Sequence, residues 1–189
     1  MVLSTRTTTT MSEYDIVNTH NSLPIIPEPL MQDVNTLIEM LPSMINYYRN
    51  NENYEMALYY ANMYYVALKS KYGKILSVDF AGVTHVLGDI YSDLNNYTYS
   101  IKFYRACIIM KRRLVLEKKI SIQLFNNTLY NYGLQLTSNK EFSNALPILR
   151  EYIKTENYEP TIIITSKNKK DVIEYLHILG AIAICLKKL

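Results

Sequence analysis

The side chains that most often carry out chemistry in proteins are few in this chain of 189 residues, and they lie far apart. The three histidines are His20, His85 and His177, and the two cysteines are Cys107 and Cys185. A nucleophile needs a neighbouring base, and a metal needs several ligands at short spacings. The sequence contains no Cys-x-x-Cys, no His-Glu-x-x-His and no glycine-rich phosphate loop. We therefore expect a protein that is not an enzyme and that uses no metal or cofactor.

The cysteine content also bears on the compartment. Two cysteines so far apart do not make a disulfide framework, which favours a reducing, cytoplasmic environment. The first residues lack the apolar core of a signal peptide. The longest nearly uncharged apolar run, 178–186, is shorter than the ~20 residues that a membrane-spanning helix needs. We expect a soluble, intracellular protein without a membrane span.

The overall composition is that of a globular helical protein. Hydrophobic residues make up 49% and charged residues 20% of the chain, and only 5 glycines occur. The formal net charge of +3 is too small to indicate nucleic-acid binding, which needs clustered basic side chains. One basic stretch, 111–119, is expected to be the solvated end of a helix. Binding of RNA or of an acidic partner is the alternative for this stretch.

Apolar residues recur at intervals of three and four from Leu30 onward, which predicts helices throughout. Short polar clusters at 49–53, 94–96 and 137–141 interrupt this pattern, as connections between antiparallel helices do. The proline-containing segment 1–29 is expected to be a flexible tail. The β-branched residues of 160–166 predict an extended connector, which could instead pair with a strand of a partner.

Glycine recurs at matching positions of this pattern. Gly88, Gly133 and Gly180 are separated by 45 and 47 residues. Glycine inside a helix costs about 1 kcal/mol relative to alanine, so its recurrence needs a compensating cause. A small residue follows twelve positions later, Ser100 in the first case and Ala145 in the second. Small residues on facing helices allow their backbones to approach closely. The pattern therefore predicts repeated helical hairpins in 30–189.

The best-preserved unit resembles a tetratricopeptide repeat. Its "LGDIY" at 87–91 is followed by Ser100, Tyr104 and Cys107 at the later small, aromatic and small places of the signature. The first unit has Ile45 at the place of the glycine and Ala57 at that of the small residue. The period of 43 to 47 residues is longer than the usual ~34 and is similar to the long repeats of kinesin light chain.

The resemblance covers residues 38–189 and implies an all-α, right-handed α-solenoid of antiparallel helical hairpins, with three hairpins and a final helix. It implies a protein–protein interaction module, an adaptor or scaffold that binds a protein or peptide ligand in a concave groove. Of the clamp that related proteins use for acidic chaperone tails, this sequence keeps only Asn46. The predicted groove residues are Asn46, Arg49, His85, Asp89, Ser92, Asp93, Tyr130, Asn131, Thr137 and His177.

Three further interpretations stay open at the level of sequence. A module that senses a signalling peptide and an RNA-binding helical repeat are the alternative functions. The tyrosines at 59, 60, 64 and 65 are expected in the core with their hydroxyls at its rim, although they could form a recognition surface. Residues 172–189 are apolar nearly all round, which predicts self-association, docking on a partner, or a missing next helix.

Overall fold

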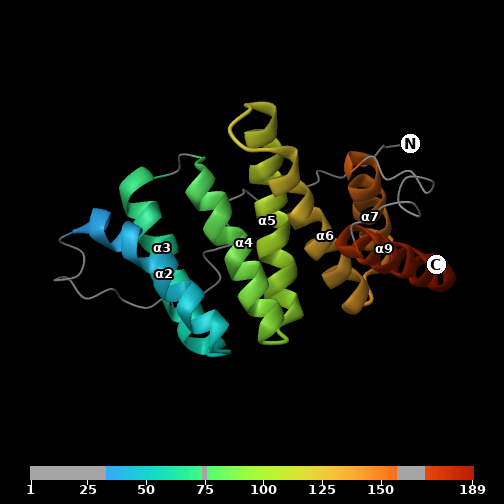
Figure 1. Ribbon diagram of the computed structural model, residues 1–189, viewed down its shortest axis with the longest axis horizontal. Coiled ribbons are helices and arrows are strands. Elements are labelled where there is room, and N and C mark those ends of the chain that lie inside the picture. The colour runs from blue at the N-terminus through green and yellow to red at the C-terminus, as the bar shows by residue number, and fades with distance from the viewer. Residues whose placement is uncertain (1–32, 74–75, 157–168) are drawn as a thin grey trace, which may run out of the picture.

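The structure is a computed structural model that describes residues 33–73, 76–156 and 169–189. These residues form helices packed side by side in a row, with α2 at one end and α9 at the other (Figure 1). The predicted flexible tail, 1–29, and the predicted extended connector, 160–166, lie outside the described residues. The helices are α2 (Val34–Asn50), α3 (Tyr54–Tyr72), α4 (Val78–Asp93), α5 (Tyr97–Leu116), α6 (Ile122–Ser138), α7 (Phe142–Glu156) and α9 (Lys169–Lys188).

Short polar side chains set where five of the helices begin. Each accepts a hydrogen bond from the backbone N–H three residues later, which satisfies one of the free donors of the first turn. The capping residues are Asp33, Asn53, Ser77, Asn96 and Ser121. The asparagines of the predicted breaks 49–53 and 94–96 thus act as helix caps. The helix boundaries confirm all three predicted breaks.

The ends of α2, α4, α5 and α6 share one turn. In each, a residue with positive φ follows the helix, and the next N–H bonds to a carbonyl five residues back. This is the Schellman arrangement, which satisfies carbonyls at the helix end. The positive-φ residues are Glu52, Asn95, Lys118 and Lys140, with φ of 57°, 57°, 55° and 62°. Such a turn folds the chain back and places the next helix against the one just ended.

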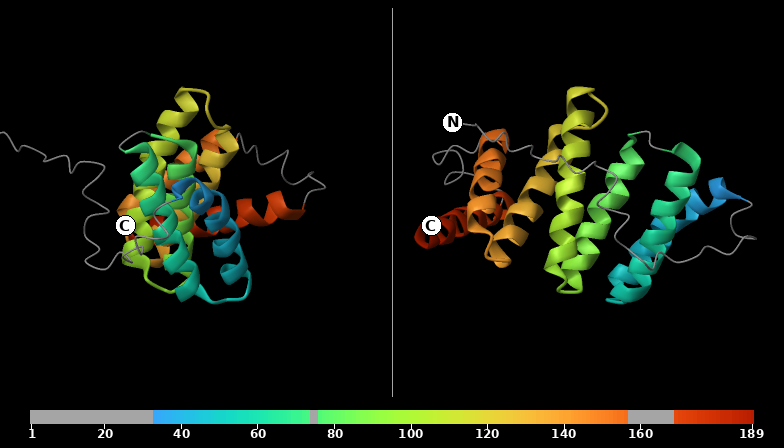
Figure 2. Two further views of the ribbon diagram at one scale, coloured as in Figure 1. Left: turned by 90° about the vertical axis from the view of Figure 1, so that its left-hand side faces the viewer. Right: turned by 180° about the vertical axis from the view of Figure 1, so that it is seen from behind.

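Each of α2 to α7 packs against the next helix along the chain, and α9 packs on α7 and, to a smaller extent, on α6. Views from the side and from behind show the same order of helices (Figure 2). The all-helical fold and its consecutive packing, both expected from the sequence, are compatible with a helical repeat. Helix α5 joins the two halves of the core, because Phe103 belongs to the cluster on its α4 side and Tyr104 to the one on its α6 side.

Two of the three recurring glycines, Gly88 and Gly133, lie where the two helices of a hairpin approach closely, whereas no described atom comes within 4 Å of a Cβ on Gly180. A Cβ on Gly88 would lie 2.8 Å from the ring of Tyr104 in α5, and a Cβ on Gly133 would lie 2.4 Å from Cδ2 of Leu149 in α7. Ser100 is fully buried and its hydroxyl donates to the Gly88 carbonyl at 2.8 Å. The close approach predicted for these two glycines is confirmed.

The first hairpin reaches the same packing with the sizes exchanged. Tyr104 and Leu149 both lie sixteen residues after their glycines. At the corresponding places the first hairpin has Ile45 in α2 and Ala61 in α3, both buried in one core cluster. By this correspondence the large residue lies on the first helix and the small one on the second, the reverse of the other two hairpins. Such an exchange conserves the combined volume of the pair, and cores tolerate volume-conserving changes best.

The sequence was less informative for α7 and for the tyrosines. Helix α7 begins at Phe142, directly after the predicted break 137–141, and Pro147 lies in its second turn. Pro147 is exposed on the surface of α7. The tyrosines at 59, 60, 64 and 65 do not share one environment. Tyr65 is buried in the core, whereas Tyr59 is 39% exposed.

The correspondence between the glycine position and the position sixteen residues later can be tested by substitution. We expect Gly88→Ile alone to lower the free energy of unfolding by about 2 to 3 kcal/mol, because the new side chain has no room beside Tyr104. Tyr104→Ala should lower stability less in the Gly88→Ile background than in the intact chain, because the isoleucine fills part of the space that the ring leaves, although both backgrounds lose the bond from Tyr104 to Asp89. Urea unfolding measures both variants.

Gly82 is the matched control, because it lies inside α4 but no described atom comes within 4 Å of the place that a Cβ would occupy. Gly82→Ala should leave stability unchanged or raise it by up to about 1 kcal/mol. If Gly88→Ile and Gly82→Ala had the same effect, the close approach at Gly88 would not limit this hairpin.

Candidate functional site

Polar side chains connect the first helices of successive hairpins. These helices are α2, α4, α6 and α9, and the bonds between them join residues about one repeat apart in sequence. We call this set the polar ladder. Its members are Arg49, His85, Asp89, Ser92, Asp93, Thr128, Tyr130, Asn131, Gln135, Thr137, His177 and Cys185.

Arg49 makes the step from α2 to α4. One terminal nitrogen of its guanidinium lies 3.4 Å from Oδ2 of Asp89, and the other lies 3.2 Å from Oδ2 of Asp93. Asp89 and Asp93 are one turn apart on α4, so a single planar guanidinium can reach both. Burial raises the pKa of Asp93, and Arg49 opposes that rise. Arg49 thus holds two neighbouring carboxylates that would otherwise repel each other.

Asp89 is the centre of the ladder. The hydroxyl of Tyr104, from α5, donates to its Oδ1 at 2.6 Å, and the Nδ2 of Asn131, from α6, donates to the same oxygen at 3.3 Å. Burial is the largest cause that raises the pKa of Tyr104, and the charge of the Asp89 carboxylate is the second. The hydroxyl of Tyr104 therefore keeps its proton and acts as a donor. One carboxylate therefore ties together α2, α4, α5 and α6.

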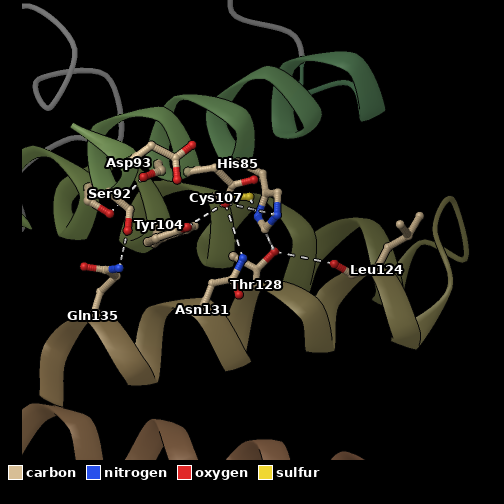
Figure 3. A network of polar contacts seen from close by, with 12 residues as sticks. His85, Ser92, Asp93, Tyr104, Cys107, Leu124, Thr128, Asn131 and Gln135 are labelled. Atoms are coloured by element: carbon tan, nitrogen blue, oxygen red, sulfur yellow. Dashed lines mark hydrogen bonds and ion pairs between the residues drawn. The ribbon is translucent and has the colours of Figure 1, made fainter. Parts of the chain in front are cut away.

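A second chain of bonds runs from Lys111 in α5 through Thr128 in α6 to His85 in α4. Figure 3 shows Thr128 close to the ring of His85. The Nζ of Lys111 donates to the carbonyl of Leu124 at 2.8 Å and to the hydroxyl of Thr128 at 2.9 Å. The Thr128 hydroxyl lies 3.1 Å from Nδ1 of His85. Because Thr128 accepts from Lys111, its one proton can go to Nδ1 of His85 at 3.1 Å or to the carbonyl of Leu124 at 3.4 Å. The shorter contact favours Nδ1 of His85 as the acceptor, which leaves Nε2–H toward Asp89.

His85 is a neutral member of this chain. Burial lowers its pKa to about 4, against the attraction of Asp89, which raises it. Its Nε2 lies 3.6 Å from Oδ1 of Asp89, too far for a strong hydrogen bond. At neutral pH the contact between them is therefore a neutral imidazole beside a carboxylate and not an ion pair.

The remaining steps reach the far end of the molecule. Gln135 in α6 donates its Nε2 proton to the hydroxyl of Ser92 in α4. The hydroxyl of Tyr130 lies 3.2 Å from Nδ1 of His177, and the hydroxyl of Thr137 lies 3.7 Å from Sγ of Cys185. The polar ladder therefore continues from α2 to α9.

One pocket of about 270 Å³ lies along the ladder, between α2, α4 and α6. It is lined by Arg49, Asp89, Ser92, Asp93, Tyr104, Asn131, Leu134 and Gln135. Figure 3 shows Ser92 and Asp93 on the side of the pocket formed by α4, with Gln135 facing them from α6. Two buried atoms of the lining have no hydrogen bond to any described residue, the donor Nε of Arg49 and the acceptor Oε1 of Gln135. We call this the ladder pocket.

Nine of the ten residues predicted for a groove belong to the polar ladder. The tenth, Asn46, is exposed on α2 and is not a member of the ladder or of the pocket lining. Five of the ten line the pocket, namely Arg49, Asp89, Ser92, Asp93 and Asn131. Tyr130, Thr137 and His177 lie farther along, between α6 and α9. The sequence pattern selected side chains of the first helices, but it did not indicate that these side chains bond to one another.

Sequence reasoning missed Thr128, Gln135 and Lys111. Thr128 and Gln135 each lie 43 residues after their partners His85 and Ser92, so the repeat period held the signal. Lys111 was expected in a solvated helix end, and this is wrong. It is only 7% exposed, while Arg112 and Arg113 beside it are exposed. Burial lowers the pKa of Lys111, although two oxygen acceptors hold its ammonium.

The ladder brings Cys107 close to Thr128 and His85, a combination that can suggest a nucleophile. Its Sγ lies 3.2 Å from the carbonyl of Ala81 and 3.9 Å from the Thr128 hydroxyl. Burial raises the pKa of the Cys107 thiol to about 11, so the reactive thiolate does not form at neutral pH. Cys107 packs as a small side chain between α4 and α5.

Two further features concern only the part of the chain that the structure describes. Within it, no three histidine, cysteine, aspartate or glutamate side chains gather closely enough to bind a metal ion. No helix within it combines the length and the apolar character needed to cross a membrane.

Comparison with protein-family models finds no match for this chain, and comparison with curated proteins finds none either.

The depressed pKa of His85 predicts a loss of stability in mild acid. The unfolded chain binds a proton near pH 6.5, whereas folded His85 binds one only near pH 4. As pH falls from 6.5 to 4, the unfolded state binds this proton before the folded state does. The free energy of unfolding therefore decreases over this range. We expect His85 to contribute a loss of about 3 kcal/mol over this range, measured by urea unfolding.

His85→Gln is the matched variant, because it keeps a hydrogen-bonding group near Thr128 but does not titrate. Other groups titrate in the same range and affect both proteins alike. The difference in stability between the two proteins should therefore shrink as pH falls. A difference that stays constant from pH 7 to pH 4 would mean that His85 is not held neutral.

Proposed function

We propose that this chain is a non-catalytic protein–protein interaction module, and that it binds a peptide segment of a partner along the first helices of its hairpins. In this proposal the hairpins are tetratricopeptide-like units of a right-handed solenoid. The polar ladder gives these helices a fixed spacing, and the ladder pocket is the place where a ligand group enters between them.

The observation that carries the proposal is the ladder pocket itself. It opens between three first helices, its lining is mainly polar, and it contains one donor and one acceptor that no described residue satisfies. A peptide backbone supplies both missing groups, a carbonyl for Nε of Arg49 and an N–H for Oε1 of Gln135. Small rotations of these two side chains would turn the atoms toward a bound chain. A set of contacts that only holds the helices together would not need a pocket with two unsatisfied polar atoms.

The charges of the pocket indicate which side chain it favours. Arg49 carries one positive charge, and Asp89 and Asp93 carry two negative charges, while His85 beside them is neutral. The excess negative charge favours a lysine or arginine of the peptide over an acidic residue. Asp93 is the more exposed of the two carboxylates, with 32% of its side chain accessible against 18% for Asp89. Asp93 is therefore the residue expected to meet the basic side chain.

Rigid positioning by the ladder supports binding in a further way. The residues around the pocket already hold one another through bonds between helices, so little side-chain freedom is lost when a ligand enters. Association of this kind depends on exposed groups at the rim more than on the ladder bonds. Variants that test binding should therefore leave Asp89 and His85 unchanged.

The test is selection from a random peptide library with the intact chain, followed by measurement of the selected peptides by isothermal titration. Ser92→Phe places a ring at the pocket and should weaken binding by tenfold or more, about 1.4 kcal/mol. Thr98→Phe makes the same kind of change on the exposed first turn of α5 and should leave affinity unchanged. Melting temperatures of both variants show whether each is folded.

Asp93→Asn tests the charge preference separately. It keeps the shape of the side chain and removes its charge, so selected peptides with a lysine or arginine should bind several-fold more weakly at low salt. Equal binding by the intact chain and by a folded Ser92→Phe variant would place the ligand elsewhere and overturn the proposal.

A further inference from the structure

The ladder pocket offers hydrogen-bond acceptors on two facing walls. On the α6 wall, Oε1 of Gln135 is buried and accepts no bond from a described residue. On the α4 wall, Oδ2 of Asp93 lies 3.2 Å from a terminal nitrogen of Arg49. A carboxylate accepts about four hydrogen bonds in all, so Asp93 keeps further acceptor sites beside that contact. Figure 3 shows Asp93 on the α4 side and Gln135 on the α6 side. A ligand that serves both walls must donate in two directions.

The lining also carries more negative than positive charge. Arg49 supplies one positive charge, and Asp89 and Asp93 supply two negative charges. Lys111 also interacts with the charge of Asp89, but two oxygen acceptors of α6 hold its ammonium outside the lining. Burial raises the pKa of Asp93, and the attraction of Arg49 opposes that rise. A second cation beside Asp93 would therefore stabilise its charged form.

The pocket has room and an apolar contact beside these groups. Its volume is about 270 Å³, many times the roughly 15 Å³ that a cavity needs to hold one water. Leu134 of α6 lies in the lining, next to Gln135 in the chain. An apolar side chain at this place can contact the methylene stem of a long side chain whose charged head group reaches the acceptors. The lining therefore suits a long cationic side chain.

We propose that the ladder pocket selects an arginine of the bound peptide over a lysine, an inference that rests on the peptide-binding function proposed above. The guanidinium of that arginine lies between the two walls and donates to Asp93 on one side and to Gln135 on the other. Its methylene stem lies against Leu134. The backbone carbonyl of the same residue accepts from Nε of Arg49, the buried donor that no described residue satisfies.

Arginine and lysine differ in how they fit this arrangement. A guanidinium is a rigid, planar group whose five donors point outward along several edges, so it can bond to two walls at once. An ammonium has three donors on one small, strongly hydrated centre, so it loses more hydration when it enters a partly enclosed space. A guanidinium also forms paired hydrogen bonds with a carboxylate such as that of Asp93. We therefore expect arginine to bind about fivefold or more tightly than lysine.

The first test uses small probes and does not depend on a peptide library. N-acetyl-arginine amide is titrated into the isotope-labelled intact chain, and the side-chain amide signals are followed by NMR. Gln135 and Asn131 are the reporters because both line the pocket, and Asn127 is the reference because it is exposed on the same helix outside the lining. The signals of the two reporters should shift and that of the reference should not. N-acetyl-lysine amide should need about fivefold or more ligand for the same shift.

The second test assigns the preference to the α4 wall. In a peptide selected as described above, the arginine is replaced by lysine or by citrulline, which has nearly the shape of arginine but no charge, and affinities are measured by isothermal titration. Asp93→Asn should remove most of the advantage of arginine over citrulline, because the wall then carries no charge. Asp79→Asn removes the same charge from the exposed first turn of α4 and should leave that advantage unchanged.

The α6 wall is tested in the same way. Gln135→Met removes the acceptor and keeps a side chain of similar length, so it should reduce the preference for arginine over lysine. Gln123→Met makes the same change on the exposed first turn of α6 and should leave the preference unchanged. A ratio of two affinities is not altered by a uniform loss of binding, and melting temperatures show whether each variant is folded.

The outcomes separate this inference from the function on which it rests. Selected peptides without an enriched arginine, equal binding of arginine and lysine, or a preference that survives both Asp93→Asn and Gln135→Met would overturn the choice of arginine. Peptide binding at the pocket would still be supported in that case if Ser92→Phe abolishes it. If no peptide is selected and the arginine probe shifts neither Gln135 nor Asn131, the function and the inference both fail.

Discussion

The close approach of two helices at one small residue is the constraint on which the rest of this structure depends. At Gly88 and Gly133 the second helix of the hairpin lies so near that a methyl group would collide with Tyr104 or Leu149. At the corresponding positions of the first hairpin the small residue is on the second helix, since Ile45 and Ala61 take the two places and both belong to one core cluster. Because interiors are densely packed, this contact fixes the distance within each hairpin and hence where its first helix stands relative to the next.

The polar ladder depends on that spacing. Its bonds join residues of successive first helices, and most of them span distances of 3.1 to 3.4 Å that a small shift of one hairpin would break. The ladder in turn explains why charged and neutral titratable groups coexist between packed helices. Asp89 is matched by Arg49, Tyr104 and Asn131, and Lys111 is matched by two oxygens, whereas His85 gives up its proton. Buried charges persist where partners are fixed in place, and otherwise they are neutralised.

The ladder pocket follows from the same geometry. It lies where three first helices, α2, α4 and α6, leave polar space between them.

The sequence by itself determined the local structure. Helical periodicity, asparagine caps and the recurrence of Gly88 and Gly133 predicted the helices, their breaks and the close contacts, because these features depend on neighbours a few residues apart or on a fixed period. Only the tertiary structure decided the partners of the polar residues. Whether Lys111 is solvated, His85 is neutral or Gly180 is covered depends on how one hairpin is set against the next. The arrangement of one hairpin against the next arises from many packing contacts together, and no short stretch of sequence contains that information.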